Sequence, residues 1–259
     1  MKTATDKADD LPRRESGHFT TMVVEAHAKV NLTLEVLGVR PDGYHDLRSV
    51  VAPIPLHDDV ELSPAPDGEI SAGEIAGVPA ESNLVVRAAR ALAAAAGCRK
   101  GTRIRVTKRI PMGAGLGGGS ADAAAVINGL NAMWNLNLPV ERLCEIGAEV
   151  GSDVPALVLG GFVLMEGRGE RVTRIAPGEV RERMEDLVLH VPPVFSSTAE
   201  VYREFREEDR GLCENDLQPA ACRLHPEIAA AMDELRARGL SGVRMSGSGS
   251  AVFGFTPTH

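Results

Sequence analysis

Aromatic residues and paired cysteines are both scarce in this chain. It has one Trp, two Tyr and six Phe among 259 residues, so each tyrosine is conspicuous where it stands beside other candidate functional residues. The four cysteines are widely separated and form no Cys-x-x-Cys pair, which argues against a metal centre or a disulfide framework. Free thiols in a reducing compartment fit this pattern, so we expect a cytoplasmic protein.

The sequence also lacks a long hydrophobic run and an excess of positive charge. Nowhere do about 18 apolar residues follow one another, so no membrane span is expected. The net charge of −8, from 28 basic and 36 acidic residues, argues against general nucleic-acid binding, and an anionic ligand would need a local cationic pocket. Residues 1–20 lack the apolar segment of a secretory signal, and we expect them to form a disordered tail.

Hydrophobic periodicity predicts an α+β protein of two domains. The glycine pair at residues 160–161 marks the expected boundary, which gives an N-terminal domain at 21–160 and a C-terminal domain at 161–259. Strands are expected at 21–37 (one bent strand or two short ones), 47–62, 102–110, 162–166, 186–191 and 242–245. Helices are expected at 83–96, 120–133, 139–150, from 197 or 198, and at 215–224 and 226–238.

The most informative stretch runs from Pro111 to Ala125 (PMGAGLGGGSADAAA). Five of the seven residues at 113–119 are glycines, which let the backbone adopt positive φ angles and come close to a ligand. Alanine, the strongest helix former, follows at once. A glycine loop that leads into a helix presents unpaired amides and the positive end of the helix dipole, so this stretch predicts a phosphate-binding loop.

Three other interpretations of the glycine loop are weaker. Gly113, Gly115 and Gly118 satisfy the Gly-x-Gly-x-x-Gly pattern of dinucleotide-binding folds. However, the preceding strand is charged on one face, and the next segment after the helix is again helical instead of a strand that ends in an acidic residue. A Walker A loop requires Gly-Lys-Ser/Thr, and this loop has no lysine. A tight turn without a ligand would not need five glycines, which are costly in folding entropy.

Together with this loop, several other stretches resemble the GHMP kinase superfamily, which includes galacto-, homoserine, mevalonate and phosphomevalonate kinases. They occur in the family's order between Val23 and Phe255, at residues 26–32 (AHAKVNL), 40–47 (RPDGYHDL), 111–124 (PMGAGLGGGSADAA), 151–155 (GSDVP) and 246–249 (SGSG). The Pro-Asp-Gly-Tyr-His segment is the most specific. It is similar to one branch of the superfamily, whose members phosphorylate a cytidine-diphosphate sugar alcohol.

The resemblance implies a fold and a reaction. An N-terminal domain of the ribosomal-protein-S5-like type would carry the loop, and a ferredoxin-like C-terminal domain would follow. ATP and the cytidine-diphosphate substrate would lie in the cleft between them, and the γ-phosphoryl group would pass to the substrate's 2-hydroxyl. Mg²⁺ is expected with ATP, but no protein ligand for it is assigned beyond Ser120 as a candidate. We expect a monomer or a weak homodimer.

Lys29 and Asp153 match the family's catalytic positions. Phosphoryl transfer needs a group that receives the hydroxyl proton, and Asp153 matches that general base. Lys29 matches its charged partner, because a nearby lysine favours the ionised carboxylate. Each residue also has a plainer interpretation. Asp153 would be a helix N-cap before Pro155, and Lys29 a solvated lysine on a strand.

The other implied contacts divide between the acceptor and the nucleotide. Tyr44, His45 and Tyr202 would contact the cytidine base, with the two tyrosines on its two faces, and Asn31 would lie near the reacting hydroxyl. Packing of a helix face is the alternative for Tyr202. Residues 246–250 would form a second phosphate cradle or a flexible turn. The expected nucleotide contacts are Asn83, Lys108, Pro111, Met112, Gly113, Ala114, Gly115, Leu116, Gly117, Gly118, Gly119, Ser120 and Ala121.

Two other functions compete with this interpretation. A GHMP-type kinase could act on another small alcohol, such as homoserine or a mevalonate derivative, but Tyr44, His45 and Tyr202 would then have no base to bind. A non-catalytic nucleotide-binding homologue is the other candidate. The presence of both Lys29 and Asp153 argues against it.

Overall fold

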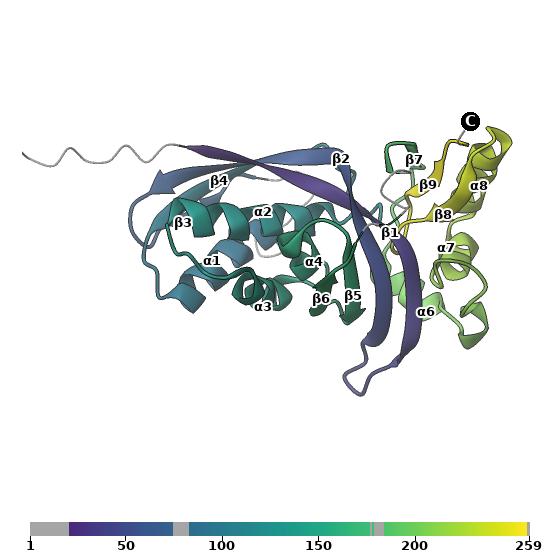
Figure 1. Ribbon diagram of the computed structural model, residues 1–259, viewed down its shortest axis with the longest axis horizontal. Coiled ribbons are helices and arrows are strands. Elements are labelled where there is room, and N and C mark those ends of the chain that lie inside the picture. Colours follow the sequence, from purple (N-terminus) through teal and green to yellow (C-terminus); the bar gives the residue numbers. More distant parts are fainter. Residues whose placement is uncertain (1–20, 75–82, 177, 179–183, 258–259) are drawn as a thin grey trace, which may run out of the picture.

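A long antiparallel hairpin runs from the far end of the N-terminal half to the C-terminal half, where it bends (Figure 1). It consists of β1 (Met22–Val39) and β2 (His45–Ala65). The computed structural model describes residues 21–74, 83–176, 178 and 184–257, so the expected tail at 1–20 lies outside the described residues. β1 is continuous but shifts its register against β2 at three points, and such bulges bend a strand. Of the two possibilities for residues 21–37, one bent strand is the one observed.

The turn between β1 and β2 is the Pro-Asp-Gly turn that the sequence predicts. The Gly43 amide donates to the Arg40 carbonyl (3.0 Å), and the Arg40 amide donates to the Tyr44 carbonyl (2.7 Å). Gly43 has φ = 82°, which glycine adopts without strain. The Asp42 carboxylate accepts a hydrogen bond from the Tyr44 amide (3.1 Å). The turn therefore fixes the backbone immediately before His45, where β2 begins.

Within the described residues, six strands form the first sheet. Their order is β3-β4-β2-β5-β6 with β1 paired to β2, and the pairings are antiparallel except β3–β4. Beside the hairpin, the strands are β3 (Ile70–Ala72), β4 (Gly101–Thr107), β5 (Val163–Gly167) and β6 (Arg171–Arg174). Because β5 pairs with β2, this sheet continues past the predicted domain boundary at 160–161. Among the described strands, β6 is the last one that belongs to the first sheet, and the strand that follows it belongs to a second sheet.

The helices of this half gather on one side of the sheet (Figure 1). They are α1 (Leu84–Ala96), α2 (Gly118–Met133), α3 (Val140–Val150) and α4 (Val154–Leu159). α2 packs against β1, β2 and the other three helices, which explains why its sequence is apolar on nearly all sides. Since α2 follows the glycine loop directly, its burial anchors the end of that loop.

The C-terminal half contributes a second sheet, which within the described residues has three strands in the order β7-β9-β8. Its elements are β7 (Leu187–His190), α6 (Thr198–Glu204), the 3₁₀ helix η2 (Glu207–Asp209), α7 (Gln218–Leu224), α8 (Pro226–Ala237), β8 (Ser241–Met245) and β9 (Val252–Phe255). In the described part of the chain, no helix combines the length and the apolar composition needed to cross a membrane.

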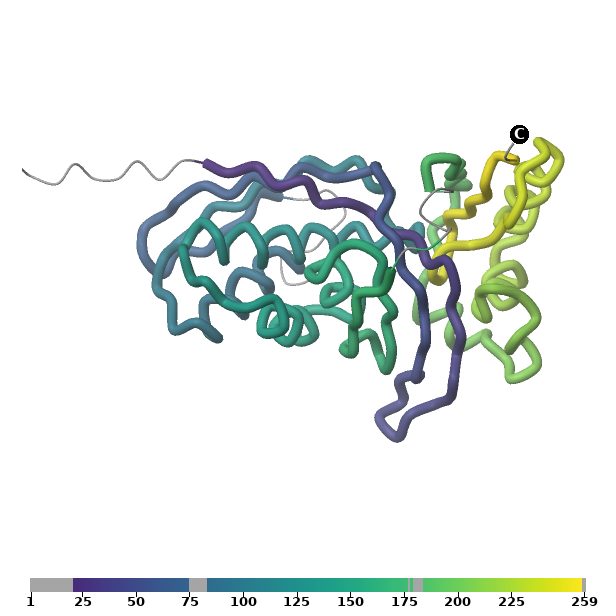
Figure 2. The backbone as a smooth tube through the Cα atoms, in the orientation of Figure 1, coloured from purple at the N-terminus to yellow at the C-terminus, as the bar shows by residue number. Residues whose placement is uncertain are grey.

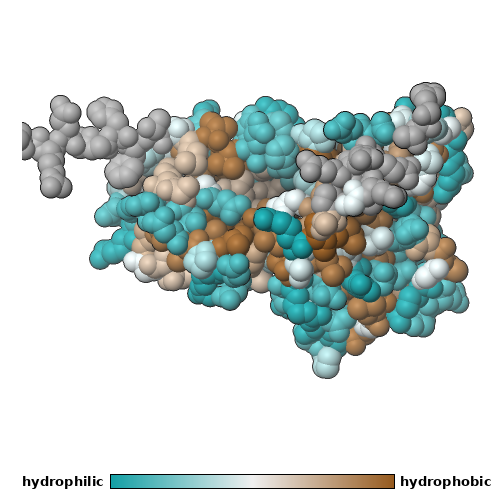
Figure 3. Space-filling view, in the orientation of Figure 1, coloured by the Kyte–Doolittle hydropathy of each residue, from teal (hydrophilic) through white to brown (hydrophobic). Residues whose placement is uncertain are grey.

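β1 belongs to both halves of the molecule, as its path in Figure 2 shows. Its first part, including Val30, is buried in the core of the first sheet, whereas Leu34 and Val36 are buried among α7, α8 and β9. The Leu34 amide donates to the Glu214 carbonyl (2.8 Å), and the Asp216 amide donates to the Leu34 carbonyl (2.9 Å). On the face in Figure 3, hydrophobic residues gather mainly toward the middle. Because both halves pack against this one strand, β1 fixes their position relative to each other.

Candidate active site

A cavity of about 350 Å³ lies where the two halves meet. The first half contributes residues of β1, the glycine loop and the start of α4, and the second half contributes α6 and the β8–β9 turn. Of the predicted site residues, those that line it are Lys29, Asn31, Lys108, Pro111, Met112, Gly113, Ala114, Gly115, Leu116, Gly117, Gly118, Gly119, Ser120, Asp153 and Tyr202. The tertiary structure thus brings together most of the predicted nucleotide and catalytic residues.

The glycine loop has the backbone of a phosphate cradle. Gly113, Gly115 and Gly117 have φ values of 65°, 72° and 70°, which residues with a side chain rarely adopt. Gly117 caps α2 without any side-chain hydrogen bond, so no side chain from the cap satisfies the first amides of the helix. Two of the residues that carry these amides, Gly118 and Gly119, line the cavity. An anionic group there would meet both the amides and the positive end of the α2 dipole.

Gly115→Ala is expected to lower the free energy of unfolding by about 2–5 kcal/mol, the sum of a left-handed alanine and an overpacking clash. A Cβ at this position would lie 2.1 Å from the Ser246 carbonyl oxygen, and a backbone atom cannot easily move away. Gly160→Ala is the matched control, since Gly160 has φ = 68° and no atom within 4 Å of its Cβ position. Urea unfolding that finds equal losses in both variants would contradict the predicted clash.

Residues 246–250, between β8 and β9, pack closely against the glycine loop. The Ser246 hydroxyl donates to the Gly115 carbonyl (3.0 Å) and accepts from the Asn31 amide (3.2 Å). The hydroxyls of Ser248 and Thr198 lie 2.8 Å apart. Gly247 and Ser248 line the cavity. Of the two predicted alternatives, cradle or flexible turn, these anchored contacts favour a cradle.

Lys29 and Asp153 face each other in the cavity. The Lys29 Nζ atom lies 3.4 Å from Asp153 Oδ2 and also donates to Asn31 Oδ1 (2.6 Å) and to the Gly115 carbonyl (3.0 Å). The Lys29 side chain is 4% exposed and that of Asp153 is 31% exposed. The ammonium group is therefore enclosed and held by three oxygen atoms, while the carboxylate remains accessible to a ligand.

The plainer interpretations of both residues disagree with this geometry. A solvated strand lysine would be exposed, but Lys29 is buried. Asp153 occupies the N-cap position of α4, yet its side chain makes no capping hydrogen bond. Its carboxylate is therefore available for another task. Asn31 is fixed from the other side, because its Nδ2 donates to the Ser49 hydroxyl (2.8 Å).

A second cavity, of about 590 Å³, continues from the first toward the β1–β2 turn. Asp153 and Tyr202 line both cavities, whereas Tyr44, His45 and Arg168 line only the second. The predicted base-binding residues thus surround one space, and Asp153 lies where that space meets the glycine-loop cavity. A ligand that spans both cavities would pass the carboxylate.

The aromatic residues of the second cavity already make contacts with neighbouring groups. The His45 ring stacks on Tyr202 with centroids 4.7 Å apart, and the Arg168 guanidinium carbon lies 4.9 Å from the Tyr44 ring centroid. One face of Tyr202 is therefore occupied by His45, which the sequence did not suggest. Burial, and secondarily the charge of Arg210, lowers the pKa of His45, so its neutral form is favoured.

Lys108 is held between two buried carboxylates. Its Nζ donates to Asp58 Oδ2 (2.5 Å) and to Asp122 Oδ2 (2.7 Å). Asp58 Oδ1 in turn accepts from the Ile110 amide (2.9 Å), which anchors the start of the glycine loop. Burial raises the pKa of Asp122 to about 7, although Lys108 favours the charged form. Neither aspartate was predicted as a site residue, and the position of Asp122 directly after the glycine loop is the one feature of the sequence that indicates such a role.

The wild type is expected to become less stable as the pH rises, and Asp122→Asn is expected to abolish this pH dependence. A carboxyl group with a native pKa near 7 and an unfolded pKa near 4 binds more protons in the native state between these values, so stability falls there as the pH rises. From pH 5 to pH 8 the stability of the variant relative to wild type should rise by about 2–3 kcal/mol. Urea unfolding at both pH values measures this difference, and parallel curves would contradict it.

Two predicted nucleotide contacts lie away from the glycine-loop cavity. Asn83 is buried and caps α1, since its Oδ1 accepts from the Val85 amide (3.1 Å). Its neighbour Leu84 lines the cavity instead. Ala121 is buried within α2 and lines a separate cavity behind β1. Thr198 and Arg168 were not predicted as contacts, because only the tertiary structure places them beside the cavities.

Two family models match just over half of the chain, and known proteins match about nine tenths of it. The model described as the GHMP kinases N terminal domain matches residues 83–161, and the GHMP kinases C terminal model matches residues 197–259. The 4-diphosphocytidyl-2-C-methyl-D-erythritol kinase of Pelotomaculum thermopropionicum is 44% identical over 89% of this chain and 88% of its own length. The enzyme of that name from Symbiobacterium thermophilum is 41% identical over 91% of each chain.

Solved structures agree with these matches. The crystal structure of a 4-(cytidine 5'-diphospho)-2C-methyl-D-erythritol kinase is 37% identical, with a TM-score of 0.75 over 90% of each chain. A homoserine kinase from Cytophaga hutchinsonii is 19% identical with a TM-score of 0.70, which shows a shared fold. The predicted two-domain α+β architecture is confirmed. This chain belongs to the GHMP kinase family and, within it, to the group of the 4-diphosphocytidyl-2-C-methyl-D-erythritol kinases.

Proposed function

We propose that this chain transfers the γ-phosphoryl group of ATP to the 2-hydroxyl of 4-diphosphocytidyl-2-C-methyl-D-erythritol, a step of the non-mevalonate isoprenoid pathway. The observation that carries the proposal is the Lys29–Asp153 pair at the junction of the two cavities. The glycine-loop cavity suits the triphosphate, and the second cavity, with its aromatic residues, suits the cytidine base. The named relatives act on a substrate of this kind, as their names state.

The residues around the junction suit in-line phosphoryl transfer. The Asp153 carboxylate accepts the proton of the attacking hydroxyl as the new O–P bond forms, while the bond between the γ-phosphorus and the β–γ bridging oxygen of ATP breaks and ADP leaves. The Lys29 ammonium, 3.4 Å from that carboxylate, stabilises the negative charge on the attacking oxygen and on the transferred group. Asn31 holds the ammonium through its Oδ1 atom (2.6 Å). The amides at the start of α2 stabilise the phosphate oxygens.

The first cavity offers few oxygen ligands for Mg²⁺. Mg²⁺ is usually bound by one or two carboxylates together with water and substrate phosphates. Ser120 lines the cavity and carries a suitable oxygen atom, so it is the residue that would hold the ion together with the substrate phosphates. When bound with ATP, the ion supplies neutralisation of the phosphate charge. The Mg²⁺ ligands stay a prediction. The expected monomer or weak homodimer stays a prediction as well.

Base recognition would use the second cavity. Tyr44, His45 and Tyr202 present aromatic surface there, and base stacking on such rings is worth about 1–3 kcal/mol in nucleic-acid complexes. Burial, and secondarily the charge of Asp153, raises the pKa of Tyr202 well above its usual range, so its hydroxyl stays protonated and able to donate a hydrogen bond. The stacked His45 ring holds Tyr202 in place.

An acceptor assay tests the proposed function. The full chain is incubated with ATP, Mg²⁺ and one of three acceptors: 4-diphosphocytidyl-2-C-methyl-D-erythritol, homoserine or mevalonate. Phosphorylation of the first alone, with cytidine monophosphate as a competitor, is the expected result. In the same assay Tyr202→Leu should raise KM about tenfold, from the loss of roughly one stacking contact. Turnover of homoserine or mevalonate would assign another acceptor, and binding of ATP without any turnover would indicate a non-catalytic homologue.

A further inference from the structure

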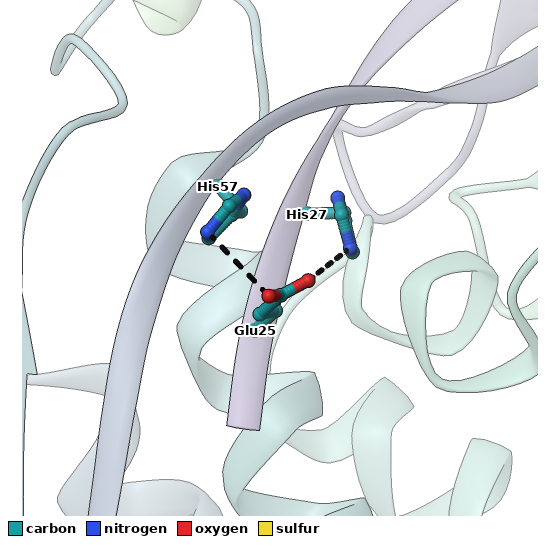
Figure 4. Close-up of side chains that lie close together, drawn as sticks. All are labelled: Glu25, His27 and His57. Carbon is teal, nitrogen blue, oxygen red and sulfur yellow. Dashed lines mark ion pairs between the residues drawn. The ribbon is translucent and has the colours of Figure 1, made fainter. Parts of the chain in front are cut away.

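Three side chains of the β1–β2 hairpin converge on one point (Figure 4), and none of them lines either cavity of the proposed active site. Glu25 and His27 come from β1, and His57 comes from β2. His27 and His57 are directly paired across the two strands, and their ring centroids lie 5.2 Å apart. One ligand atom from each of the three residues lies within 4.8 Å of the others.

Backbone carbonyls set the orientation of both imidazole rings. The Nδ1 atom of His27 lies 3.2 Å from the Ile54 carbonyl oxygen, and Nδ1 of His57 lies 2.9 Å from the Pro55 carbonyl oxygen. A carbonyl oxygen only accepts hydrogen bonds, so Nδ1 must carry the proton in each ring. The neutral rings then have their lone pairs on Nε2. This carbonyl-anchored arrangement is the one that metal-binding histidines commonly show.

Both Nε2 atoms point at the Glu25 carboxylate. Nε2 of His27 lies 3.2 Å from Oε2, and Nε2 of His57 lies 3.9 Å from Oε1. One divalent cation between the two Nε2 atoms and the carboxylate would satisfy all three groups at once. We propose that Glu25, His27 and His57 form a binding site for a divalent transition-metal ion of the zinc class.

Small movements of the three side chains would bring their ligand atoms to zinc-binding distances. Zinc binds imidazole nitrogen and carboxylate oxygen at about 2.0–2.2 Å, so ligand atoms of a tetrahedral site lie about 3.3–3.5 Å apart. The His27–Glu25 distance of 3.2 Å is already close to this value. The His57–Glu25 distance must shorten from 3.9 Å, and the Glu25 side chain, which is 61% exposed, is free to rotate. Water would complete the coordination.

The neighbouring charges leave Glu25 as the carboxylate for the metal. Asp59 Oδ1 lies 3.6 Å from Nε2 of His57, but the other oxygen of Asp59 accepts a hydrogen bond from the Arg109 guanidinium (2.6 Å). Asp59 is thus already neutralised by Arg109. Two imidazoles and one carboxylate favour zinc, copper or nickel over the magnesium expected with ATP, which prefers oxygen ligands.

Zinc binding to the full chain tests this site. Equilibrium dialysis against Zn²⁺ alone, with metal content measured by mass spectrometry, is performed on wild type and on His27→Gln, His57→Gln and Glu25→Gln. In each variant the zinc affinity of this site should fall at least tenfold. At a zinc concentration that saturates the wild-type site, the wild type should therefore bind up to one equivalent per chain more than any variant. A tenfold excess of Mg²⁺ should not displace that equivalent.

Matched controls separate this site from other zinc ligands in the chain. His190→Gln alters a histidine of β7 outside the cluster and should bind as much zinc as wild type. Zinc held by the four free cysteines would be the same in every variant. Circular dichroism without metal checks that each variant is folded. Equal zinc affinity in wild type and any one of the three cluster variants overturns the three-residue site.

Discussion

Asp153→Asn is expected to lower kcat about 10²–10⁴-fold, the range that a positioned general base contributes, with little change in KM for either substrate. Asparagine keeps the size of the side chain but cannot accept the hydroxyl proton. Because the carboxylate is 31% exposed and makes no capping hydrogen bond, the substitution should leave the fold intact. Steady-state turnover with ATP and the cytidyl acceptor measures the effect.

Asp233→Asn provides the control for that measurement. Asp233 is an exposed residue of α8 that pairs with Arg236 (2.7 Å) on the surface, and its substitution should change neither kcat nor KM. The pH profile adds a second readout, since loss of a base removes the acidic limb of kcat in the variant. An unchanged kcat for Asp153→Asn would exclude its carboxylate as the base.

Lys29→Met should lower kcat about 10²–10³-fold, as expected for one preorganised electrostatic group. It should also lower stability by about 1–3 kcal/mol, because Asn31 Oδ1 and the Gly115 carbonyl lose their ammonium donor while they remain enclosed. Methionine preserves most of the volume, so a cavity contributes little. Turnover and urea unfolding are measured on the same preparation.

Lys100→Met separates the two effects. The Lys100 ammonium also donates to a backbone carbonyl, that of Trp134 (2.7 Å), but it lies outside both cavities. Its substitution should cost stability without affecting turnover. If Lys29→Met and Lys100→Met lower kcat to the same extent, the proposed role of the Lys29 charge is wrong.

Local features were predictable where neighbouring residues carry the signal. The Pro-Asp-Gly turn was correct because its hydrogen bonds join residues four or fewer positions apart. The same reason applies to α2, which begins at Gly118, within two residues of its predicted start at residue 120. Lys29 and Asp153 came from family motifs, and the structure adds that their charged groups lie 3.4 Å apart.

Features that depend on distant segments escaped the sequence. Nothing near residue 58 indicated that Asp58 would hold Lys108, since the strands β2 and β4 must first pair. The division of sheets after β6, in place of residues 160–161, depends on β5 pairing with β2. Likewise, the stacking of His45 on Tyr202 requires the β1–β2 hairpin to reach α6.

The sequence by itself determined the phosphate-binding loop, the family and the identity of the principal catalytic candidates, because short motifs and backbone preferences encode them. Only the tertiary structure decided how these parts meet. It placed Asp153 between two cavities, and it brought His57 to Glu25 and His27 through the register of one hairpin. Such contacts depend on strand pairing and on packing between two cores, and these are set by the whole chain and not by any short stretch of it.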